Sequence, residues 1–589
     1  MSLSQVIFTQ DKCIMRTEGS ICQTTKELLS SELFAEVVKK FVEHLHKHNS
    51  ILLGIFNGEE IREEMVDRLI STLRMLGEVS VNQVATMSPE TRIFIRNTNL
   101  LNDFVEGLYN YWRSFDRFLV CYSEVKKRKN LENRPYHVFN ETVEQLTHLV
   151  RAAYRDIQEN ITGRHCRVYR QVHAGSQLAL IAVKKKWPYP SGQYAMLSSV
   201  PMIRQILLNP PLVIDPPMNK RTGQFQKVDK NPLEGWNVNV NEWLCYPARV
   251  GPLLIHIFFN QIFMELGCSL ANLFELAEDE DLEKKPDAIY TYGVPGEALY
   301  RYGSLPTVFF DDTENDILVG AVPGKLEFGY FGYLKKMILT LHNIVMMKRG
   351  RTPFHGAMVH ILLKNGKKAT VLLIGDTAAG KSETLEAFRV LSDEYNIRNI
   401  IIIADDMGSL KIDANGRLLG YGTETGAFVR LDDLQQGYAF GQIDRAIIMS
   451  PQKMNARAVL PVTTLANVLR GYPIDFLLYA NNYEEVDENH PIIERFRSKD
   501  KAIRVFREGM TMAKGTTTSS GIVHTYFANI FGPPQYRDLH EHLTSKYFQA
   551  AFDSGIFVGQ IRTRLGISGW ETKGPEEGAR ALFNLISSH

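Results

Sequence analysis

The sequence predicts a mixed α/β (α+β) protein that begins with a mostly helical region. Three observations lead to this prediction. Residues 1–160 place apolar side chains at spacings of three and four, as amphipathic helices do. Residues 349–589 alternate strand-like and helix-like segments. Within that second region, a glycine-containing loop follows an apolar strand and precedes a helical pattern, which is typical of phosphate-binding loops.

Length and charge limit the kinds of protein that this chain can be. It has 589 residues, with 67 Lys+Arg against 66 Asp+Glu, so its formal net charge is +1. At roughly 150 residues per domain, we expect several domains. The neutral balance argues against nucleic acid or an anionic membrane being bound through bulk positive charge. We therefore expect small-molecule substrates, and neither nucleic acid nor a membrane as a partner.

Cysteine usage and apolar stretches indicate the compartment. The six cysteines are scattered without CxxC spacing, which favours neither a zinc ribbon nor a disulfide framework. The first residues lack the pattern of a secretion signal. The most apolar stretch, Pro252–Met264, is too short to span a bilayer and contains His, Asn and Gln, so we predict a buried core helix there. We expect a soluble, cytoplasmic protein, whose oligomeric state stays open.

The first two regions divide near residue 160. Helical periodicity predicts helices over Lys26–His48 and Glu59–Met75, and no catalytic motif is evident in residues 1–160. From residue 161 the chain becomes richer in short strand-like segments broken by proline, and Asp287–Val294 and Ile317–Pro323 are predicted to be buried strands. We therefore predict a second domain over residues 161–348.

The third region, residues 349–589, starts near Lys348–Thr352. Ala369–Ile374 is predicted to be a strand, and Ser382–Leu391 has helical periodicity. Asn399–Ala404 contains four consecutive isoleucines, as a strand buried on both faces would. These segments predict an α/β domain around the glycine-containing loop.

That loop matches the pattern G-x-x-x-x-G-K-[ST]. Its residues are Gly375, Asp376, Thr377, Ala378, Ala379, Gly380, Lys381 and Ser382. Glycines allow successive backbone N–H groups to point at phosphate oxygens, Lys381 supplies positive charge to the outer phosphates, and the Ser382 hydroxyl can bind Mg²⁺. The loop therefore predicts a nucleotide site in the last domain.

A pair of acids follows the isoleucine strand. Asp405 and Asp406 stand where carboxylates after a phosphate loop hold the divalent metal of a nucleotide. Because Met407 and Gly408 come next, a plain turn or helix cap formed by aspartate is the alternative.

The loop and the acid pair together resemble the phosphoenolpyruvate carboxykinases and the HPr kinase/phosphorylases. Three further segments are similar to the carboxykinases over residues 160–589: Tyr330–Lys336 (YFGYLKK), Phe354–Ala357 (FHGA), and Gly420–Leu431 (GYGTETGAFVRL) followed by Asn455-Ala456-Arg457. The resemblance implies a two-lobed carboxykinase-like fold with a nucleotide-binding C-terminal domain.

The resemblance also implies roles for single residues. Lys336, His355 and Asp406 would hold Mn²⁺, with Asp405 beside them, and Lys381 and Ser382 would hold the nucleotide phosphates and Mg²⁺. Arg457 would contact the transferred phosphoryl group, and Lys335, Tyr330 and Gly332 would line the substrate pocket. Glu424 matches an acidic position near the nucleotide.

The implied activity is the interconversion of oxaloacetate with phosphoenolpyruvate and CO₂. The sequence leaves the phosphoryl donor open among ATP, GTP and pyrophosphate. Two departures from the family stand out. The reactive cysteine of the GTP-type loop is replaced by Ala379, and no segment clearly matches the family's N-terminal substrate-carboxylate arginine, for which Arg92 and Arg96 are the candidates.

Two other functions remain open. The segment GKSET resembles the HPr kinases, which favours a kinase acting on a protein serine or a small alcohol. The helical N-terminal region and the missing arginine favour a non-catalytic nucleotide-binding scaffold. Each residue also has a simpler interpretation: Lys335 and Lys336 as a solvated pair on a helix, His355 as a structural histidine, and Arg457 as a surface residue.

Overall fold

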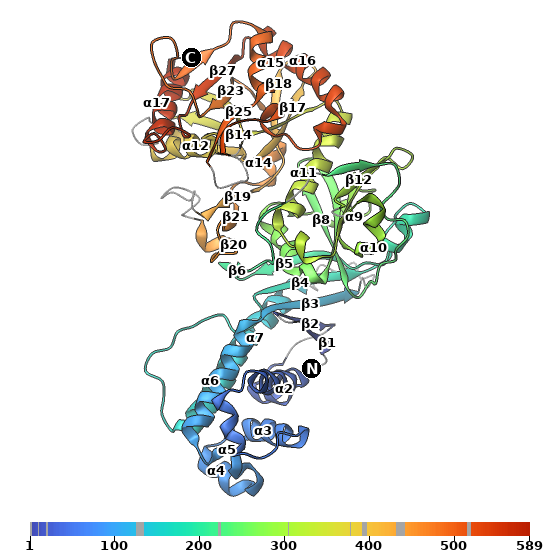
Figure 1. Cartoon of the computed structure of the whole chain (residues 1–589), viewed down its shortest axis with the longest axis vertical. Helices are drawn as coiled ribbons and strands as arrows, with labels where there is room; N and C mark the ends of the chain where they lie inside the picture. Colours follow the sequence, from blue (N-terminus) through green and yellow to red (C-terminus); the bar gives the residue numbers. More distant parts are fainter. Residues whose placement is uncertain are drawn as a thin grey trace. The chain divides into compact units, whose positions relative to one another are not determined.

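The structure is a computed structural model (Figure 1), and it describes residues 3–9, 11–18, 22–124, 135–221, 225–303, 306–376, 378–391, 397–431, 442–514 and 520–588. Helices and strands occur throughout these residues, which confirms the mixed α/β class. The chain forms two compact units: unit 1 is Met1–Lys184 with Ile203–Asn209, and unit 2 is Lys185–Met202 with Pro210–His589. In the described part of the chain, no helix is both long enough and apolar enough to cross a membrane.

Unit 1 combines helices with a small sheet. Its helices are α1 (Thr25–Ser30), α2 (Glu32–Lys47), α3 (Glu63–Leu76), α4 (Val81–Met87), α5 (Arg92–Ile95), α6 (Thr98–Ser114) and α7 (Pro135–Thr162). Its strands are β1 (Leu3–Phe8), β2 (Lys12–Thr17), β3 (Asp116–Glu124), β4 (Leu178–Lys184) and β5 (Met202–Leu208), in that spatial order. The helices α1, α2 and α3 lie inside the segments for which periodicity predicts helix, to within one residue at either end. The three strands before residue 160 are not predicted by the sequence.

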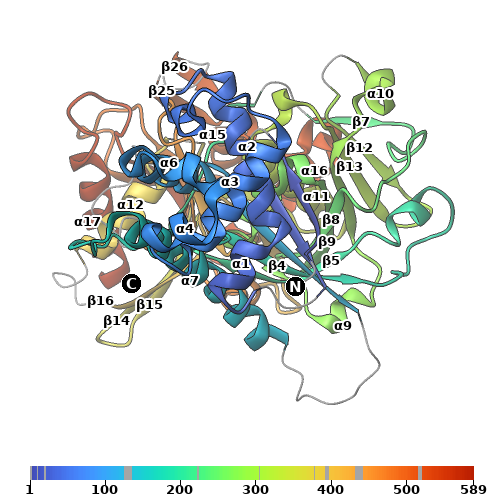
Figure 2. The same ribbon diagram turned by 90° about the horizontal axis from the view of Figure 1, so that it is seen from below.

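The helices of unit 1 pack on one another through their apolar faces. Figure 2 shows α2, α3 and α6 grouped together, and α7 packs against α1, α3 and α6. Helix α2 begins after Ser31, whose hydroxyl accepts a hydrogen bond from the Phe34 N–H, and its apolar residues face the core. The core of unit 1 is therefore formed by amphipathic helices, as the sequence predicts.

One buried charge links the helices of unit 1 to its sheet. Arg117, in β3, donates hydrogen bonds to five backbone carbonyls, those of Trp112, Arg113, Phe115, His173 and Gly175. Burial lowers the pKa of Arg117 to about 10, so the guanidinium remains charged at neutral pH. It ties the end of α6 to the segment before β4.

The first part of unit 2 is a mixed sheet with short helices. Its strands are β7 (Gln226–Val228), β8 (Trp243–Val250), β9 (Leu253–Asn260), β10 (Glu275–Leu276), β11 (Ala288–Val294), β12 (Val308–Asp312) and β13 (Ile317–Pro323), and its helices are α8 (Met264–Ser269), α9 (Asp279–Leu282), α10 (Gly296–Leu299) and α11 (Phe331–Lys348). The main path of the sheet is β8-β9-β11-β13-β12-β7. The predicted strands at Asp287–Val294 and Ile317–Pro323 are β11 and β13.

The predicted core helix over Pro252–Met264 is wrong. Most of this stretch is strand β9, and only its last residue, Met264, begins an α-helix, α8. The stretch is buried as expected, because β9 lies between β8 and β11 and Leu253–Phe259 are all covered. A strand covered on both faces carries no alternation of polar and apolar residues, so a short apolar run cannot be told from a buried helix by periodicity.

Helix α11 is buried along nearly its whole length. It packs against β11, β13 and β14, and residues 331–335 and 337–347 are buried, with Lys336 half-buried among them. A helix that is apolar all round belongs inside a protein. Its early turns therefore carry Lys335 and Lys336 into the interior of unit 2.

The second part of unit 2 contains the predicted nucleotide region. Its strands are β14 (Thr352–Leu363), β15 (Lys368–Ile374), β16 (Ile397–Ala404), β17 (Met407–Ile412), β18 (Leu418–Gly422), β22 (Tyr472–Pro473), β23 (Phe476–Asn481), β24 (Ile493–Arg495), β25 (Met510–Lys514), β26 (Ser520–His524) and β27 (Phe557–Arg562). Its helices are α12 (Lys381–Val390), α14 (Leu465–Leu469), α15 (Lys499–Glu508), α16 (Arg537–Asp553) and α17 (Lys573–Ser588).

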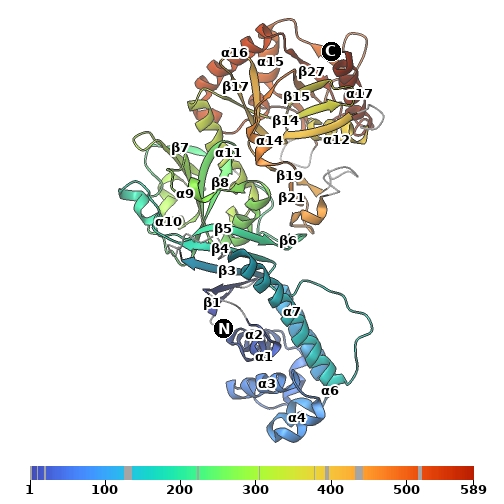
Figure 3. The same ribbon diagram turned by 180° about the vertical axis from the view of Figure 1, so that it is seen from behind.

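The sheet of this second part has the order β22-β18-β17-β14-β15-β23-β27-β24. Strands β15, β23 and β27 run parallel, whereas β14 and β15 are antiparallel, so the sheet is mixed. Helices α12 and α17 pack together on one face (Figure 3). The carboxyl ends of three parallel strands thus meet where α12 begins, the edge at which open α/β sheets bind ligands.

Strand β16 is less buried than the sequence predicts. It pairs with β14, and Ile400, Ile401 and Ile402 are only half-buried. Ile400 and Ile402 line the cleft described below. The isoleucine run is therefore a strand, as predicted, but it is not covered on both faces.

A small third sheet holds two distant parts of unit 2 together. Its order is β19-β21-β20-β6, with β6 (Leu212–Ile214), β19 (Gly426–Arg430), β20 (Ile447–Met449) and β21 (Arg457–Pro461). β6 runs parallel to β20, and the Lys453 ammonium bonds the carboxylate of Asp215 at 2.8 Å. The segment that leads to residue 221 is thus attached to the segment that leads to Arg457.

Candidate active site

Most of the predicted site residues line one cleft of unit 2, with a cavity volume of about 250 Å³. The cleft lies beside the start of α12, where β14 begins and β15 ends. The predicted residues in its lining are Tyr330, Lys335, Lys336, His355, Ala378, Ala379, Gly380, Lys381, Ser382, Asp405, Asp406 and Arg457. These residues come from segments up to 127 positions apart, between Tyr330 and Arg457, and the fold brings them together.

The remaining predicted residues lie around this lining. Gly375 and Asp376 form the buried start of the loop after β15, and Gly332 is buried in the first turn of α11. Glu424 is buried next to Lys335, 3.1 Å from its ammonium. Thr377 lies outside the described residues.

The loop from Gly375 to Ser382 is held from outside by two side chains. The carbonyl of Ala378 accepts a hydrogen bond from the Asn482 amide at 2.8 Å, and the carbonyl of Ala379 accepts one from the Thr563 hydroxyl at 2.7 Å. Ala378 and Gly380 have positive φ values of 65° and 88°. Alternation of conformations of this kind forms concave nests of N–H groups that bind anions. Anchoring the carbonyls therefore favours an anion on the opposite side.

Lys381 and Ser382 begin α12 at the edge of the cleft. The Lys381 ammonium donates to the carbonyls of Gly375 at 2.6 Å and Asp376 at 2.9 Å, which closes the loop on itself. Burial lowers the pKa of Lys381. The Ser382 hydroxyl is 3.5 Å from the Asp405 carboxylate, so a hydroxyl and a carboxylate face one another beside the anion site.

Asp406 is the centre of the polar network. Its Oδ2 is 2.7 Å from the Lys335 ammonium, and its Oδ1 is 2.8 Å from Nε2 of His355. Burial acts to raise the pKa of Asp406, but Lys335 and His355 lower it well below its ordinary value. Burial, and then the charge of Asp406, raise the pKa of Asp405. Of the two adjacent acids, Asp405 is therefore the one that binds a proton more readily.

Glu424 shares the ammonium of Lys335 with Asp406. Among the described residues, neither carboxylate oxygen of Glu424 accepts a well-aligned hydrogen bond, although the Lys335 ammonium lies 3.1 Å from one of them. Burial raises the pKa of Glu424 to about 8, although Lys335 acts to lower it. One ammonium neutralises one carboxylate, so Asp406 carries the charge and Glu424 retains its proton near neutral pH.

Lys336 occupies a different environment from its neighbour. Burial, and then the positive charge of Arg221, lower the pKa of Lys336 to about 8. Its ammonium lies 5.3 Å from the centre of the Phe531 ring. Lys336 is thus closer to the neutral form at physiological pH than an ordinary lysine.

Arg457 and Lys335 both lie near one aromatic ring. The guanidinium of Arg457 is 5.3 Å, and the ammonium of Lys335 is 5.8 Å, from the centre of the Phe428 ring. Arg457 is also opposite Arg430 in the β19–β21 pair. The resulting wall of the cleft is positively charged and partly aromatic, which suits a planar anion.

The donor set of the cleft fits a divalent transition metal. Among the described side chains there is no group of three or more His, Cys, Asp or Glu placed to hold a metal ion. The predicted Mn²⁺ ligands include only two of those types, His355 and Asp406, and the third is the amine of Lys336. The hydroxyl of Ser382 is the predicted ligand of the nucleotide's Mg²⁺. Imidazole and carboxylate suit Mn²⁺, and the lowered pKa of Lys336 favours the neutral amine that a ligand must be.

Several residues of the site were missed by sequence reasoning. Asn482 and Thr563 anchor the loop, Arg221 acts on Lys336, and Phe428 lies beside Arg457. Asn482 and Thr563 come directly after β23 and β27, so a polar residue at the carboxyl end of a buried strand is the signal that could have found them. Arg221 has no such signal, because the sequence around it has no helix or strand pattern.

The chain matches no protein-family model, and no curated protein matches it.

Proposed function

We propose that residues 161–589 form a phosphoenolpyruvate carboxykinase-like enzyme, with lobes at residues 161–348 and 349–589. The observation that carries this proposal is that Lys336, His355, Lys381, Asp406 and Arg457 line one cleft. A phosphate loop alone would support any nucleotide-binding protein. Lys336, His355 and Arg457 are the residues of this set that favour decarboxylation with phosphoryl transfer over plain nucleotide binding.

The phosphoryl donor would lie on the loop from Gly375 to Ser382. Backbone N–H groups of the loop and the start of α12 would bind its phosphates, and Lys381 would leave the loop carbonyls to pair with the outer phosphates. ATP, GTP and pyrophosphate all carry this group of oxygens, and each remains a candidate donor.

Arg221 would supply the substrate-carboxylate arginine that the sequence lacks. It lies close enough to Lys336 to lower the pKa of that amine, and its own pKa is lowered by burial. Arg92, one of the sequence candidates, belongs to α5 of unit 1, where its Nε donates to the Ala85 carbonyl. Arg221, Lys336 and Arg457 together would neutralise the negative charge of a dicarboxylate such as oxaloacetate and of the phosphoryl group that its enolate receives.

The proposed reaction has two steps, decarboxylation and phosphoryl transfer. The bond between the methylene carbon and the β-carboxylate of oxaloacetate breaks, CO₂ leaves, and the electron pair remains as an enolate. The enolate oxygen then attacks the terminal phosphorus of the donor, whose shortened phosphate leaves. When bound, Mn²⁺ and Mg²⁺ would stabilise the negative charge on the enolate and on the phosphates. Arg457 and Lys381 would neutralise the phosphoryl oxygens during the transfer.

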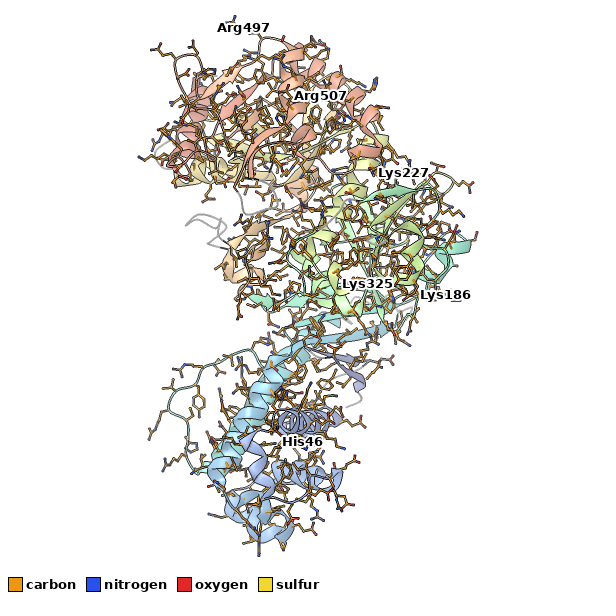
Figure 4. The ribbon with its side chains drawn as sticks, in the orientation of Figure 1. His46, Lys186, Lys227, Lys325, Arg497 and Arg507 are labelled. Carbon is orange, nitrogen blue, oxygen red and sulfur yellow. The ribbon has the colours of Figure 1, made fainter. Side chains whose placement is uncertain are left out.

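The proposal is tested with the purified full chain. Phosphoenolpyruvate, bicarbonate, Mn²⁺ and either ADP, GDP or inorganic phosphate should yield oxaloacetate, measured through coupled reduction to malate. Arg221→Gln should lower kcat/KM for phosphoenolpyruvate by about 100-fold, since it removes a charged contact of about 3 kcal/mol. The matched control is Arg497→Gln, because Arg497 is an exposed arginine of the same unit (Figure 4).

The outcomes separate the three candidate functions. If no oxaloacetate forms with ADP, GDP or inorganic phosphate, the carboxykinase proposal is refuted. Transfer of labelled phosphate from ATP to a protein serine, without oxaloacetate turnover, would instead favour the kinase that GKSET resembles. Nucleotide binding with neither activity would favour a scaffold.

A further inference from the structure

Three consecutive residues beside the cleft adopt a left-handed backbone conformation. Phe527, Ala528 and Asn529 have φ values of 45°, 58° and 64°. For an L-residue this conformation costs roughly 1–2 kcal/mol, and it is normally adopted by single residues, most often glycine. A run of three residues with side chains therefore needs an explanation in its surroundings.

The turn is held in place by packing and by backbone hydrogen bonds. Phe527 and Ala528 are buried, and the Phe527 ring lies 4.9 Å from the ring of His540. The Ala528 N–H donates to the Thr525 carbonyl at 3.0 Å, and the Asn529 N–H donates to the Tyr526 carbonyl at 3.1 Å. These contacts supply the free energy that keeps three side-chain-bearing residues in the left-handed region.

The turn presents a carbonyl to the predicted metal ligand. The Ala528 carbonyl accepts a hydrogen bond from Nδ1 of His355. A carbonyl oxygen can only accept, so Nδ1 must carry the proton, and Nε2 is the nitrogen that faces Asp406. A backbone carbonyl on the second nitrogen is how proteins orient histidines that bind metals.

The same segment also reaches the phosphate loop. The Thr525 hydroxyl donates to the Asp376 carboxylate at 2.9 Å, and Asn529 and Phe531 line the cleft. The Phe531 ring lies 5.9 Å from the ring of His355. Within seven residues, the chain therefore contacts both the histidine and the loop.

A simple change of chain direction would not require this arrangement. Nearby positions with positive φ are glycines, at Gly509, Gly521 and Gly532, whereas residues 527–529 are not. The Ala528 carbonyl, moreover, is bonded to a side chain of the site. The strained residues are thus the ones that place a backbone carbonyl beside His355.

We propose that the left-handed turn Phe527–Asn529 is a positioning element, which sets the ring of His355 and links it through Thr525 to the phosphate loop. The proposal rests on the proposed function only for the identity of the ligand that His355 would bind. The setting of the ring can be measured without any ligand.

The test compares two substitutions at one exposed position. Asn529→Gly and Asn529→Val both remove the amide, but only glycine accepts positive φ without strain. Asn49→Val is the matched control, because Asn49 is an exposed asparagine of unit 1 with a φ of 48°. The full-length proteins are labelled with ¹⁵N-histidine, and the His355 signal is assigned by its loss in His355→Gln.

In metal-free buffer, we expect the Nδ1 proton of His355, which is bonded to the Ala528 carbonyl, to exchange slowly with solvent in the wild type, in Asn529→Gly and in Asn49→Val, and to exchange quickly in Asn529→Val. With MnCl₂, Asn529→Val should bind Mn²⁺ about tenfold more weakly than Asn529→Gly. Equal exchange of the Nδ1 proton in the two Asn529 variants would overturn the proposal. If no protein binds Mn²⁺, the proposed metal chemistry fails, while the exchange comparison still decides the role of the turn.

Discussion

Glu424 offers a prediction that does not depend on the proposed enzymatic activity. Its carboxyl group is buried, and it shares the Lys335 ammonium with Asp406, which keeps the charge. Replacing Glu424 with glutamine retains the shape and removes the titrating group. We therefore expect Glu424→Gln to change how the stability of the protein depends on pH.

The magnitude follows from the two pKa values. Burial raises the pKa of Glu424 from 4.5 to about 8, so the folded state binds this proton more tightly than the unfolded state. The associated stability is fully present below pH 4.5 and is lost as the pH rises towards about 8. The slope is about 1.4 kcal/mol per pH unit well below pH 8 and halves at the pKa, so the wild type loses about 2 kcal/mol of unfolding free energy between pH 6 and pH 8 through this group.

The assay is urea unfolding of the full chain at pH 6 and pH 8 in the presence of EDTA. Glu424→Gln should lose about 2 kcal/mol less than the wild type over this interval. Glu494→Gln is the matched control: burial acts to raise the pKa of Glu494, but hydrogen bonds from Lys501 and Gln560 lower it to about 2, so it does not titrate in this range. Identical pH dependence in Glu424→Gln and the wild type would refute the reasoning.

Three further predictions test other parts of the structure. Arg117→Met should lower the unfolding free energy by about 4 kcal/mol, measured by urea unfolding, because five carbonyls lose a charged donor; an unchanged midpoint would contradict this. Asn482→Ala should weaken nucleotide binding about tenfold by calorimetry, since it frees the Ala378 carbonyl, and unaltered affinity would count against the anchoring role. Gly380→Ala should weaken it further, by about 100-fold, because φ is 88° and a Cβ would lie 2.6 Å from the Thr563 hydroxyl; wild-type affinity would show that the loop adapts.

The sequence predicts the elements that have a strong local signal. Helix α12 and strands β11, β13 and β15 lie within one residue of the predicted segments, because periodicity and glycine or proline boundaries are local properties. β9 was mistaken for a helix because burial on both faces removes the alternation that marks a strand. The short strands before residue 160 were missed for a related reason, since helices dominate the pattern around them.

For the site, motifs locate the loop and the acids but not their supports. Lys381 and Asp406 belong to short sequence motifs, and the neighbouring residues of each motif predict the function. Asn482, Thr563 and Arg221 act through contacts with residues about 100 or more positions away, which no local pattern encodes. The Ala528 carbonyl is part of the backbone, and its position beside His355 depends on positive φ values at three residues that are not glycine. The residue types there do not predict such values.

The small sheet β19-β21-β20-β6 limits how unit 2 can be divided. A fragment that begins at residue 349 would omit β6 and leave the edge of β20 without its partner, with Ile447–Met449 facing solvent. Exposed apolar edges of this kind recruit strands from other molecules. Expression of the nucleotide-binding half alone is therefore expected to give aggregates, and a fragment that begins at residue 185 is the smaller piece with every strand of this sheet in place.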